Sequence, residues 1–236
     1  MKEYSWIQYI IILILALGFF IANIQAQEKY STAPEGAIVL FDGLDFSQWT
    51  NCDDGEVKWK IIDGVMEVVP DPTFACERIQ GIKTKEKFRD FYLHVEYRLP
   101  ESENTNSGIY LLKRYEIQIN DSFQKPFSPG MGGSLYRQKM PDENVGKPRG
   151  EWQTFDIIFR APRFEVSGDF FRKIEDARIT VIHNGIVIHN NVIVQDKTGV
   201  GFPESPEPGP IMLQDHQAQV QFRNIWIYPL KNNRIS

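Results

Sequence analysis

Acidic and amide side chains alternate with apolar ones in the segment RYEIQIND, residues 114–121. Successive side chains of a β-strand point to opposite faces, so Glu116 and Gln118 project together from one face while apolar residues cover the other. A carboxylate can exchange a proton, and an amide can hydrogen-bond a hydroxyl-rich ligand such as a sugar. The segment therefore predicts either the floor of a binding site or a strand whose polar face meets only solvent.

The segment IMLQDHQAQVQFRNIWIYPL, near the C-terminus, carries a second set of reactive side chains. Gln214 and His216 stand two residues apart and share a face, and Arg223 follows on a later strand. If these strands approach the strand of Glu116, an acid, a base, a cation and amides converge, as in an active site. The alternatives are a solvated carboxylate, a turn histidine, and an arginine in a structural ion pair, for example with Asp215.

The elements that must position these residues are predicted to be β-strands. Asp63-Gly64 and Asn184-Gly185 each separate two β-rich runs, which is the pattern of a tight hairpin. Residues 122–150 and 195–210 are rich in glycine and proline and predict long loops. We expect the loop at 195–210 to border the site, because long ordered loops are often functional. No helix of useful length, repeat or linker interrupts residues 27–236, so we expect a single all-β domain, an antiparallel β-sandwich.

The chain begins with an apolar stretch that is not expected to join this fold. Residues 7–26 are almost entirely apolar and are followed by QEKY, which predicts that residues 1–26 are a secretory signal peptide cut after Ala26. The alternative is an uncleaved membrane anchor, since about 20 apolar residues span a bilayer. With cleavage, we expect a periplasmic or secreted protein with no stable membrane partner.

The charge distribution excludes some partners. The formal net charge is −5 and no basic run occurs, so nucleic acid is not an expected partner. An acidic, aromatic-rich exported domain is compatible with a carbohydrate ligand. The sequence does not indicate an oligomeric state.

Cys52 and Cys76 are the only cysteines of the chain. An exported compartment permits a disulfide between them, and two buried free thiols are the alternative. We predict that they pair if the fold brings their Cα atoms within about 7 Å.

The other histidines give weaker signals. His94 and Glu96 form an alternating pair on one predicted strand, and His183 and His189 flank the tip of a predicted hairpin. We expect all of these side chains to lie at the surface.

An ordered series of motifs resembles the 3-keto-disaccharide hydrolase domain family. In chain order these are VLFDGLDFSQW, VKWKIIDGVMEV, FRDFYLHVEYRL, NSGIYLLKRYEIQIND, GSLY, GEWQTFDIIFRA, ITVIHNGIVIHNNV and GPIMLQDHQAQVQFRNIWIYPL, together spanning residues 37–230. The resemblance implies a concanavalin-like jelly roll of two antiparallel sheets and export from a bacterium. It also implies cleavage of glycosides whose sugar carries a ketone at C3, or of 3-keto-disaccharides. Three positions depart from the usual pattern. They are Leu112, which puts a sugar contact in doubt, Gln217, which changes the turn beside His216, and Arg149.

The implied substrate suggests roles for these residues. A ketone at C3 acidifies the C2 hydrogen, so a base, Glu116 or His216, can remove it while the aglycone leaves from C1. Arg223 is expected to stabilise the enolate; the alternative is a divalent metal held by Glu116 and His216. Tyr136, in GSLY, is a candidate acid or a stacking partner, and it is expected to bind substrate together with Gln118, Asp121 and Gln214. No compact His/Cys cluster supports a metal, so none is firmly expected.

Two other functions remain open. Glu116, Gln118 and Asp121 stand at spacings similar to the Glu-x-Asp-x-x-Glu pattern of retaining jelly-roll glycosidases, in which two carboxyl groups about 5–5.5 Å apart act in double displacement. A regular strand would place Asp121 on the opposite face, so its participation requires a bulge. The second alternative is a non-catalytic carbohydrate-binding module, which would need amides and aromatic rings but no titrating groups.

Overall fold

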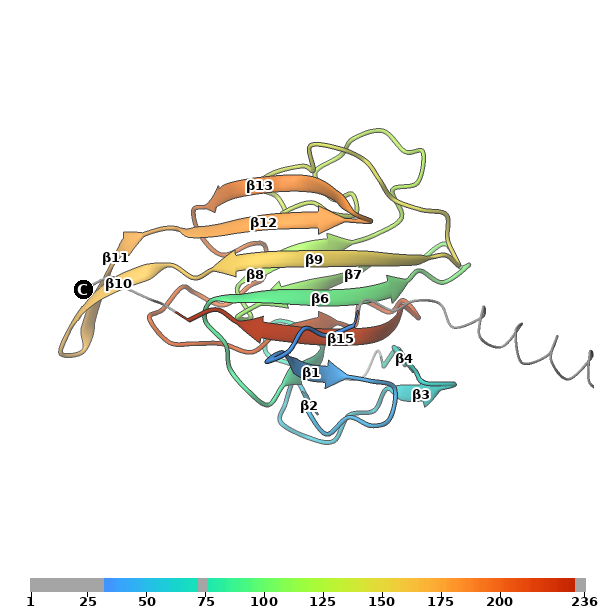
Figure 1. Ribbon diagram of the computed structural model, residues 1–236, viewed down its shortest axis with the longest axis horizontal. Coiled ribbons are helices and arrows are strands. Elements are labelled where there is room, and N and C mark those ends of the chain that lie inside the picture. The colour runs from blue at the N-terminus through green and yellow to red at the C-terminus, as the bar shows by residue number, and fades with distance from the viewer. Residues whose placement is uncertain (1–31, 72–75, 232–236) are drawn as a thin grey trace, which may run out of the picture. The chain divides into compact units, whose positions relative to one another are not determined.

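Two antiparallel sheets form the body of the protein, as a computed structural model shows (Figure 1). The structure describes residues 32–71 and 76–231, so the predicted signal peptide or anchor at residues 1–26 lies outside the described residues. A compact unit begins at Ala33. In the described ranges, no helix is long and apolar enough to cross a membrane.

The larger sheet has eight strands in the order β13-β12-β9-β6-β15-β4-β3, with β1 also paired to β15. β1 pairs with residues 225–227 of β15 and β4 with residues 221–222, so these two short strands share one edge of β15. The strands of this sheet are β1 (Ile38–Phe41), β3 (Lys60–Ile62), β4 (Val65–Glu67), β6 (Phe91–Arg98), β9 (Trp152–Arg160), β12 (Ala177–His183), β13 (Ile186–Val194) and β15 (Gln221–Pro229).

The smaller sheet has five strands in the order β2-β5-β14-β7-β8 and lies behind the larger sheet in the view of Figure 1. A separate hairpin, β10 (Arg163–Ser167) with β11 (Phe170–Glu175), protrudes from one end. The strands of the smaller sheet are β2 (Trp49–Asn51), β5 (Gly81–Thr84), β7 (Ser107–Leu111), β8 (Tyr115–Ile119) and β14 (Met212–Gln214).

The apolar halves of the alternating strands fill the space between the sheets. Ile117 and Ile119 of β8 and Val95 and Tyr97 of β6 are fully buried in one core cluster, as their period-two spacing predicts. The polar residues between them therefore lie on the outer faces of the two sheets. The predicted all-β, jelly-roll type sandwich is confirmed.

The predicted turns and the first long loop are also present. Asp63-Gly64 and Asn184-Gly185 connect β3 to β4 and β12 to β13, and all four residues have positive φ, as a tight hairpin turn requires. No strand occurs between residues 120 and 151, where the loop was expected.

One connection differs from the sequence-based expectation. β14 and β15 follow one another in the chain, but β14 pairs with β5 and β7 whereas β15 pairs with β6, β4 and β1. The chain therefore passes from the smaller sheet to the larger one between Asp215 and Val220. This passage decides which of the predicted site residues can meet.

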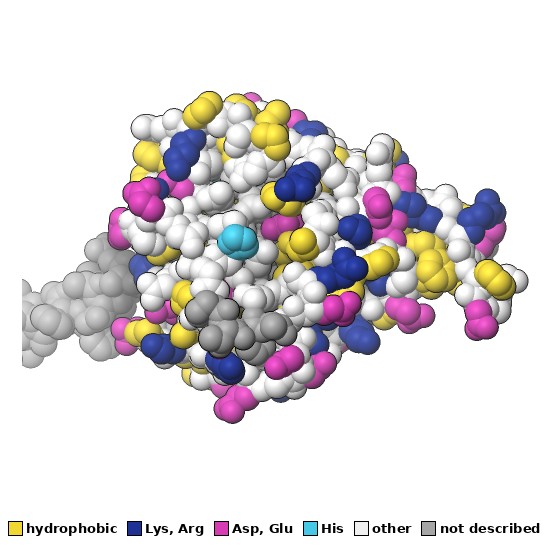
Figure 2. Space-filling view, turned by 180° about the vertical axis from the view of Figure 1, so that it is seen from behind, with side chains coloured by type: hydrophobic (Ala, Val, Ile, Leu, Met, Phe, Trp, Pro, Cys, Tyr) yellow, Lys and Arg dark blue, Asp and Glu magenta, His cyan; other side chains and the backbone are white. Residues whose placement is uncertain are grey.

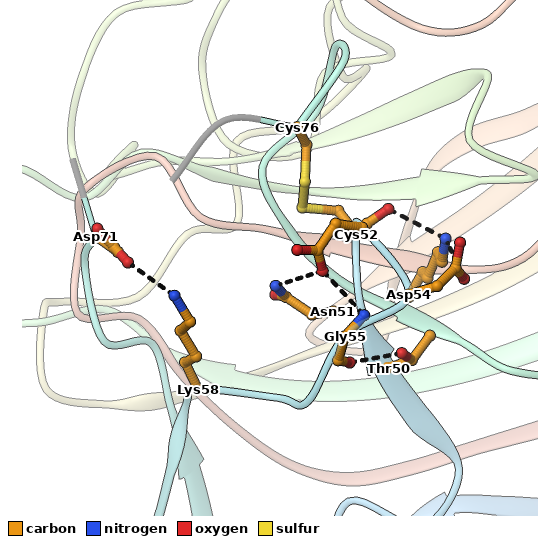
Figure 3. Close-up of a disulfide and its surroundings, with 10 residues drawn as sticks. Thr50, Asn51, Cys52, Asp54, Gly55, Lys58, Asp71 and Cys76 are labelled. Atoms are coloured by element: carbon orange, nitrogen blue, oxygen red, sulfur yellow. Dashed lines mark hydrogen bonds and ion pairs between the residues drawn. A yellow bond between two sulfur atoms is a disulfide. The ribbon is translucent and has the colours of Figure 1, made fainter. Parts of the chain in front are cut away.

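A disulfide joins Cys52 to Cys76, whose Cα atoms are 6.0 Å apart, which confirms the predicted pairing (Figure 3). Cys52 also packs against a small apolar cluster on the outer face of the smaller sheet, formed by Ile79, Tyr110 and Met212. The disulfide therefore joins the loop after β2 to the segment that precedes β5, beside this cluster.

The expectation of surface histidines is wrong. His183 is buried, where its Nε2 lies 2.9 Å from the Tyr97 hydroxyl and its ring stacks on Phe155. His189 is also buried, and its Nε2 donates to the carbonyl of Gly133 at 2.8 Å. Each imidazole therefore satisfies a polar group inside the fold.

Candidate active site

A pocket with a volume of about 250 Å³ lies on the outer face of the smaller sheet. Figure 2 shows this face, where a histidine lies near the middle and Lys and Arg side chains gather to one side. The pocket brings together residues from β7, β8, β14 and two long loops. Its lining consists of Asn106, Tyr110, Glu116, Gln118, Tyr136, Arg137, Gly199, Val200, Gln214 and His216.

Glu116 is the central acid of this pocket. Its side chain lies across Gly108 of the neighbouring strand, where an added Cβ would stand 2.6 Å from Oε1. Tyr110, directly opposite Glu116 in the β7–β8 register, donates its hydroxyl to Oε2 at 2.7 Å. Burial raises the pKa of Glu116 to about 7, and the Tyr110 hydrogen bond and the charge of Arg137 only partly oppose this shift. A carboxylate with this pKa is suited to proton transfer near neutral pH.

The loop that contains Tyr136 lies along the free edge of β8. The backbone N–H of Tyr136 donates to the carbonyl of Glu116, and that of Gln118 donates to the carbonyl of Ser134. Tyr136 is half-buried, and the neighbouring Arg137 is exposed and adopts a φ of 61°. The expected position of Tyr136 in the pocket is therefore observed, and Arg137 supplies the cation of the site.

The loop at residues 195–210 closes another side of the pocket, as predicted. Thr198 accepts the backbone N–H of Glu116 on its Oγ1 at 2.7 Å. A Cβ added to Gly199 would meet the Tyr136 ring at 3.0 Å, so the loop approaches the ring more closely than a larger residue would allow.

Gln118 and Gln214 both line the pocket, but their amides are used differently. Gln118 donates its Nε2 to the Asn106 side chain at 2.7 Å and to the carbonyl of Ser107 at 3.0 Å. Gln214 is buried, and its Oε1 has no hydrogen-bond partner within the described ranges. Gln214 therefore has spare capacity to accept a hydroxyl of a ligand, whereas Gln118 holds Asn106 in place.

His216 is exposed at the rim of the pocket, on the turn that follows β14. The next residue, Gln217, adopts a φ of 64°, and its N–H donates to Oδ1 of Asp215 at 2.9 Å. The departure from glycine at this position is therefore accommodated by a left-handed glutamine whose turn is capped by Asp215. The other notable departure, Leu112, has its side chain in the apolar core.

Arg223 does not join Glu116 and His216, so the expected convergence of all three is wrong. It lies on β15 of the larger sheet, donates its Nε to Glu96 at 2.7 Å, and stacks on Trp152 with Cζ 3.9 Å from the ring centroid. The sequence placed Arg223 beside His216 because the two are close in the chain, but the passage between sheets separates them.

Asp121 is also outside the pocket. Its carboxylate pairs with Lys125 at 2.8 Å and with Nε of Arg149 at 3.0 Å, beyond the end of β8. The strand shows no bulge that would return Asp121 to the face of Glu116. Its position gives no support to the retaining-glycosidase alternative, which needs a second carboxylate near Glu116.

The ligand set does not favour a metal at this position. Across residues 32–71 and 76–231, no three His, Cys, Asp or Glu side chains are close enough together to hold a metal ion. Glu116 and His216 therefore lack a third such donor, and we derive no step through a metal.

Three residues of the pocket and its floor were not predicted from the sequence: Tyr110, Arg137 and Gly108. Once the connection between the two strands is known to contain three residues, 112–114, Leu111 pairs with Tyr115, which places Tyr110 opposite Glu116 and Gly108 one step further along the same face. Arg137 follows Tyr136 on a loop whose course no periodicity reveals.

Known proteins resemble this chain in sequence and in fold. The chain matches the model of the 3-keto-alpha-glucoside-1,2-lyase-like domain over residues 36–228. A crystal structure of a candidate glycosyl hydrolase from Parabacteroides distasonis ATCC 8503 is 38% identical with a TM-score of 0.74, and the match covers 84% of this chain and 86% of that one. A second such structure from the same organism, 19% identical, has the same fold with a TM-score of 0.61 over 86% of this chain and all (100%) of that one. No curated protein matches the chain.

A β-sandwich with an acid, a histidine and amides on one sheet face, together with these matches, defines a carbohydrate-active protein. More specifically, the chain belongs to the family of 3-keto-alpha-glucoside-1,2-lyase-like domains. This confirms the resemblance seen in the ordered motifs.

Proposed function

We propose that this protein cleaves the glycosidic bond of 3-keto-glycosides or 3-keto-disaccharides by β-elimination, followed by hydration of the unsaturated sugar. One observation carries the proposal: Glu116 is a buried carboxylate with a pKa of about 7, in a pocket that also contains a cation and an exposed histidine. A 3-keto sugar presents an acidic hydrogen on C2, and a base that titrates near neutral pH suits its removal.

The first step uses Glu116 as the base. Its carboxylate takes the C2 proton, and the C2–H electron pair forms an enolate with the C3 carbonyl. The guanidinium of Arg137, which lines the same pocket and whose charge lowers the pKa of Glu116, stabilises the negative charge on the C3 oxygen. Arg137 thus takes the role first expected of Arg223.

The second step breaks the bond at C1. The enolate electrons form the C1–C2 double bond and restore the C3 ketone while the aglycone oxygen departs from C1. His216, exposed at the rim, donates a proton to that oxygen, and Tyr136 lies beside the sugar ring as a stacking partner. The neutral imidazole of His216 then accepts a proton from water as the water adds to C1, and Glu116 returns its proton to C2.

Comparison of oxidised and unoxidised substrates tests the proposal. The protein is incubated with a 3-keto-glucoside and with its unoxidised parent, and products are identified by mass spectrometry. We expect release of the aglycone only from the 3-keto compound, with a transient unsaturated ketone before hydration. Equal cleavage of both substrates would instead support a conventional glycosidase, and binding without cleavage of either would support a carbohydrate-binding module.

We also propose that the protein acts after export. The support is the apolar stretch at residues 7–26. N-terminal sequencing of the protein from a bacterial host is expected to begin at Gln27. A protein that retains Met1 and partitions with membranes would refute cleavage.

A further inference from the structure

A second, larger pocket lies on the same face of the smaller sheet as Glu116. Its volume is about 610 Å³, which is within the range of small-molecule sites. The register pairs Lys83 with Met212, Met212 with Tyr110, and Tyr110 with Glu116. Lys83 and Glu116 therefore lie on one transverse row, three inter-strand spacings or about 14 Å apart.

Positive charge dominates this second pocket, which we call the basic pocket. Its lining contains five cationic side chains and one carboxylate, that of Asp54. Asp54 pairs with Lys83 at 2.7 Å, and Lys83 also donates to the carbonyl of Cys52 at 3.1 Å. In the described part of the chain, none of the other four cations has a carboxylate within 4.0 Å; these are Lys85, Lys87, Lys113 and Arg114.

This gathering of cations contrasts with the rest of the molecule. The whole chain has a formal net charge of −5, so a local excess of four cations does not follow from composition. Like charges within a few ångströms repel, and the repulsion is greater where water is partly excluded. The arrangement therefore costs stability unless an anion binds between the cations.

Two residues that line the basic pocket have a strained backbone conformation. Leu112 and Lys113, at the β7–β8 turn, have φ values of 54° and 61°, a left-handed conformation that is unfavourable for residues other than glycine. This turn directs the Lys113 ammonium over the ring of Phe202, 4.7 Å from its centroid. Strained turns of non-glycine residues concentrate at ligand sites.

Arg114 and Lys113 are held in place by neutral groups, and within the described ranges neither forms an ion pair with a carboxylate. Arg114 is buried, with its terminal nitrogens on the Glu207 carbonyl at 3.0 Å and the Ser205 hydroxyl at 2.5 Å, both neutral groups. Burial lowers the pKa of Lys113 and the charges of Lys83 and Lys87 lower it further, while the charges of Asp54 and Glu77 oppose this shift only in part. A bound anion would reverse this effect.

We propose that the basic pocket binds the carboxylate or sulfate group of an acidic sugar residue. The inference rests on the carbohydrate-cleaving function proposed above for the same sheet face, and it assigns the substrate class: a glycoside in which a residue other than the oxidised ring is acidic. The ring of Phe202 and the prolines of the 195–210 loop supply apolar surface for the sugar, and the cations supply the recognition of the acid.

Calorimetric titration with unoxidised disaccharides tests the proposal without requiring turnover. The ligands are a glucuronic acid–glucose disaccharide, the neutral glucose disaccharide with the same linkage, and sodium sulfate. The proteins are the wild type, the double variant Lys87→Gln/Lys113→Gln, and Lys60→Gln, which removes an exposed lysine from β3 of the other sheet. Lys83 is left intact because its ammonium also holds Asp54 and the Cys52 carbonyl.

We expect the wild type and Lys60→Gln to bind the acidic disaccharide at least tenfold more tightly than the neutral one at low salt. Added salt should weaken this preference, and Lys87→Gln/Lys113→Gln should remove it. Equal affinity for the two disaccharides, or an unchanged preference in the double variant, would overturn the proposal. Sulfate that binds as tightly as the acidic disaccharide would overturn the assignment to a sugar. A wild type that keeps the acidic preference but cleaves no 3-keto-glycoside would refute the proposed function and still support the basic pocket.

Discussion

Glu116 and Glu96 are both buried strand glutamates on outer sheet faces, but their surroundings give them opposite pKa shifts. Glu116 accepts one hydrogen bond from a neutral group, Tyr110, and burial raises its pKa to about 7. Glu96 is also desolvated by burial, but hydrogen bonds from His94, Asn224 and Arg223 outweigh that effect and lower its pKa to about 2. An acid, a histidine and an arginine are present in both places.

The difference between the two glutamates is in how completely the acid is paired. Glu96 receives an arginine at 2.7 Å and an amide at 2.8 Å, and its histidine neighbour, His94, is itself held by Asp156 at 2.8 Å. Such a network fixes each member and leaves its carboxylate charged. Glu116 borders a pocket and keeps capacity for a new partner. Reactive side chains therefore indicate a site only where their bonding is incomplete.

The largest expected effect is a difference in turnover between variants of the two glutamates. Glu116→Gln keeps the shape and can still accept from Tyr110 but cannot accept the C2 proton, so turnover of a 3-keto-glycoside should fall 100-fold or more. Glu96→Gln should leave turnover within about threefold, because the residue lies in the other sheet. Steady-state kinetics of both variants measures this, and an equal loss in both would contradict the distinction.

Substitution of His216 and of His94 should also have different effects on turnover, with a somewhat smaller difference than for the two glutamates. His216→Ala should lower turnover about 100-fold if the imidazole protonates the leaving oxygen, with more of the activity retained for aglycones that leave easily as anions. His94→Gln is the matched control, since His94 is a member of the paired network. Turnover that is unchanged in His216→Ala with every aglycone would rule out this role.

Stability should depend on pH in opposite directions for the two glutamates. The folded pKa of Glu116 is above the ordinary glutamate value of 4.5, so its stabilising contribution is present below pH 4.5 and is lost as pH rises through about 7. Glu116→Gln should therefore be more stable than the wild type at pH 8, by up to about 3 kcal/mol, and similar to it at pH 4.5.

The folded pKa of Glu96 is below the ordinary glutamate value of 4.5, so its contribution is present above pH 4.5 and is lost as pH falls toward 2. Glu96→Gln should therefore be destabilised by about 2 kcal/mol at pH 7 and much less at pH 3. Urea unfolding at each pH measures both variants. The same pH dependence in the two would show that their environments do not differ as described.

The smallest expected effect concerns the single donor to Glu116. Tyr110→Phe removes the hydrogen bond that lowers the pKa of Glu116, so this pKa should rise. The increase of kcat/KM with pH should therefore occur about one pH unit higher than in the wild type. Tyr115→Phe is a matched control, since Tyr115 donates to Glu204 at 2.6 Å on the core side of the same strand. A pH profile displaced equally in both variants would indicate a general structural effect.

The sequence predicted strands, turns and site residues where the relevant contacts are local. Period-two alternation placed Glu116 and Gln118 on one face, and the two glycine-containing turns were found from their dipeptides. Local pattern also identified Gln214 and His216 as neighbours. Each of these predictions depends only on contacts within one strand or one hairpin.

The errors arose where distant segments meet. Arg223 follows His216 by only seven residues, but strand pairing, which no local pattern encodes, assigns them to different sheets. His183 and His189 flank a hairpin tip, where solvent exposure is expected. Instead, His183 hydrogen-bonds Tyr97 and His189 hydrogen-bonds Gly133, both from other segments of the chain. Burial by a partner distant in sequence is therefore the information that a single sequence did not supply.

The position of β14 has a consequence for how the molecule is made. Residues 212–214 form the middle strand of the smaller sheet, between β5 and β7, which precede them by roughly a hundred residues or more. Until this last portion of the chain is synthesised, the facing edges of β5 and β7 have no partner and remain open to wrong pairing. The pocket of Glu116 is thus among the last parts to form, and a growing chain has no working site for nearly all of its synthesis.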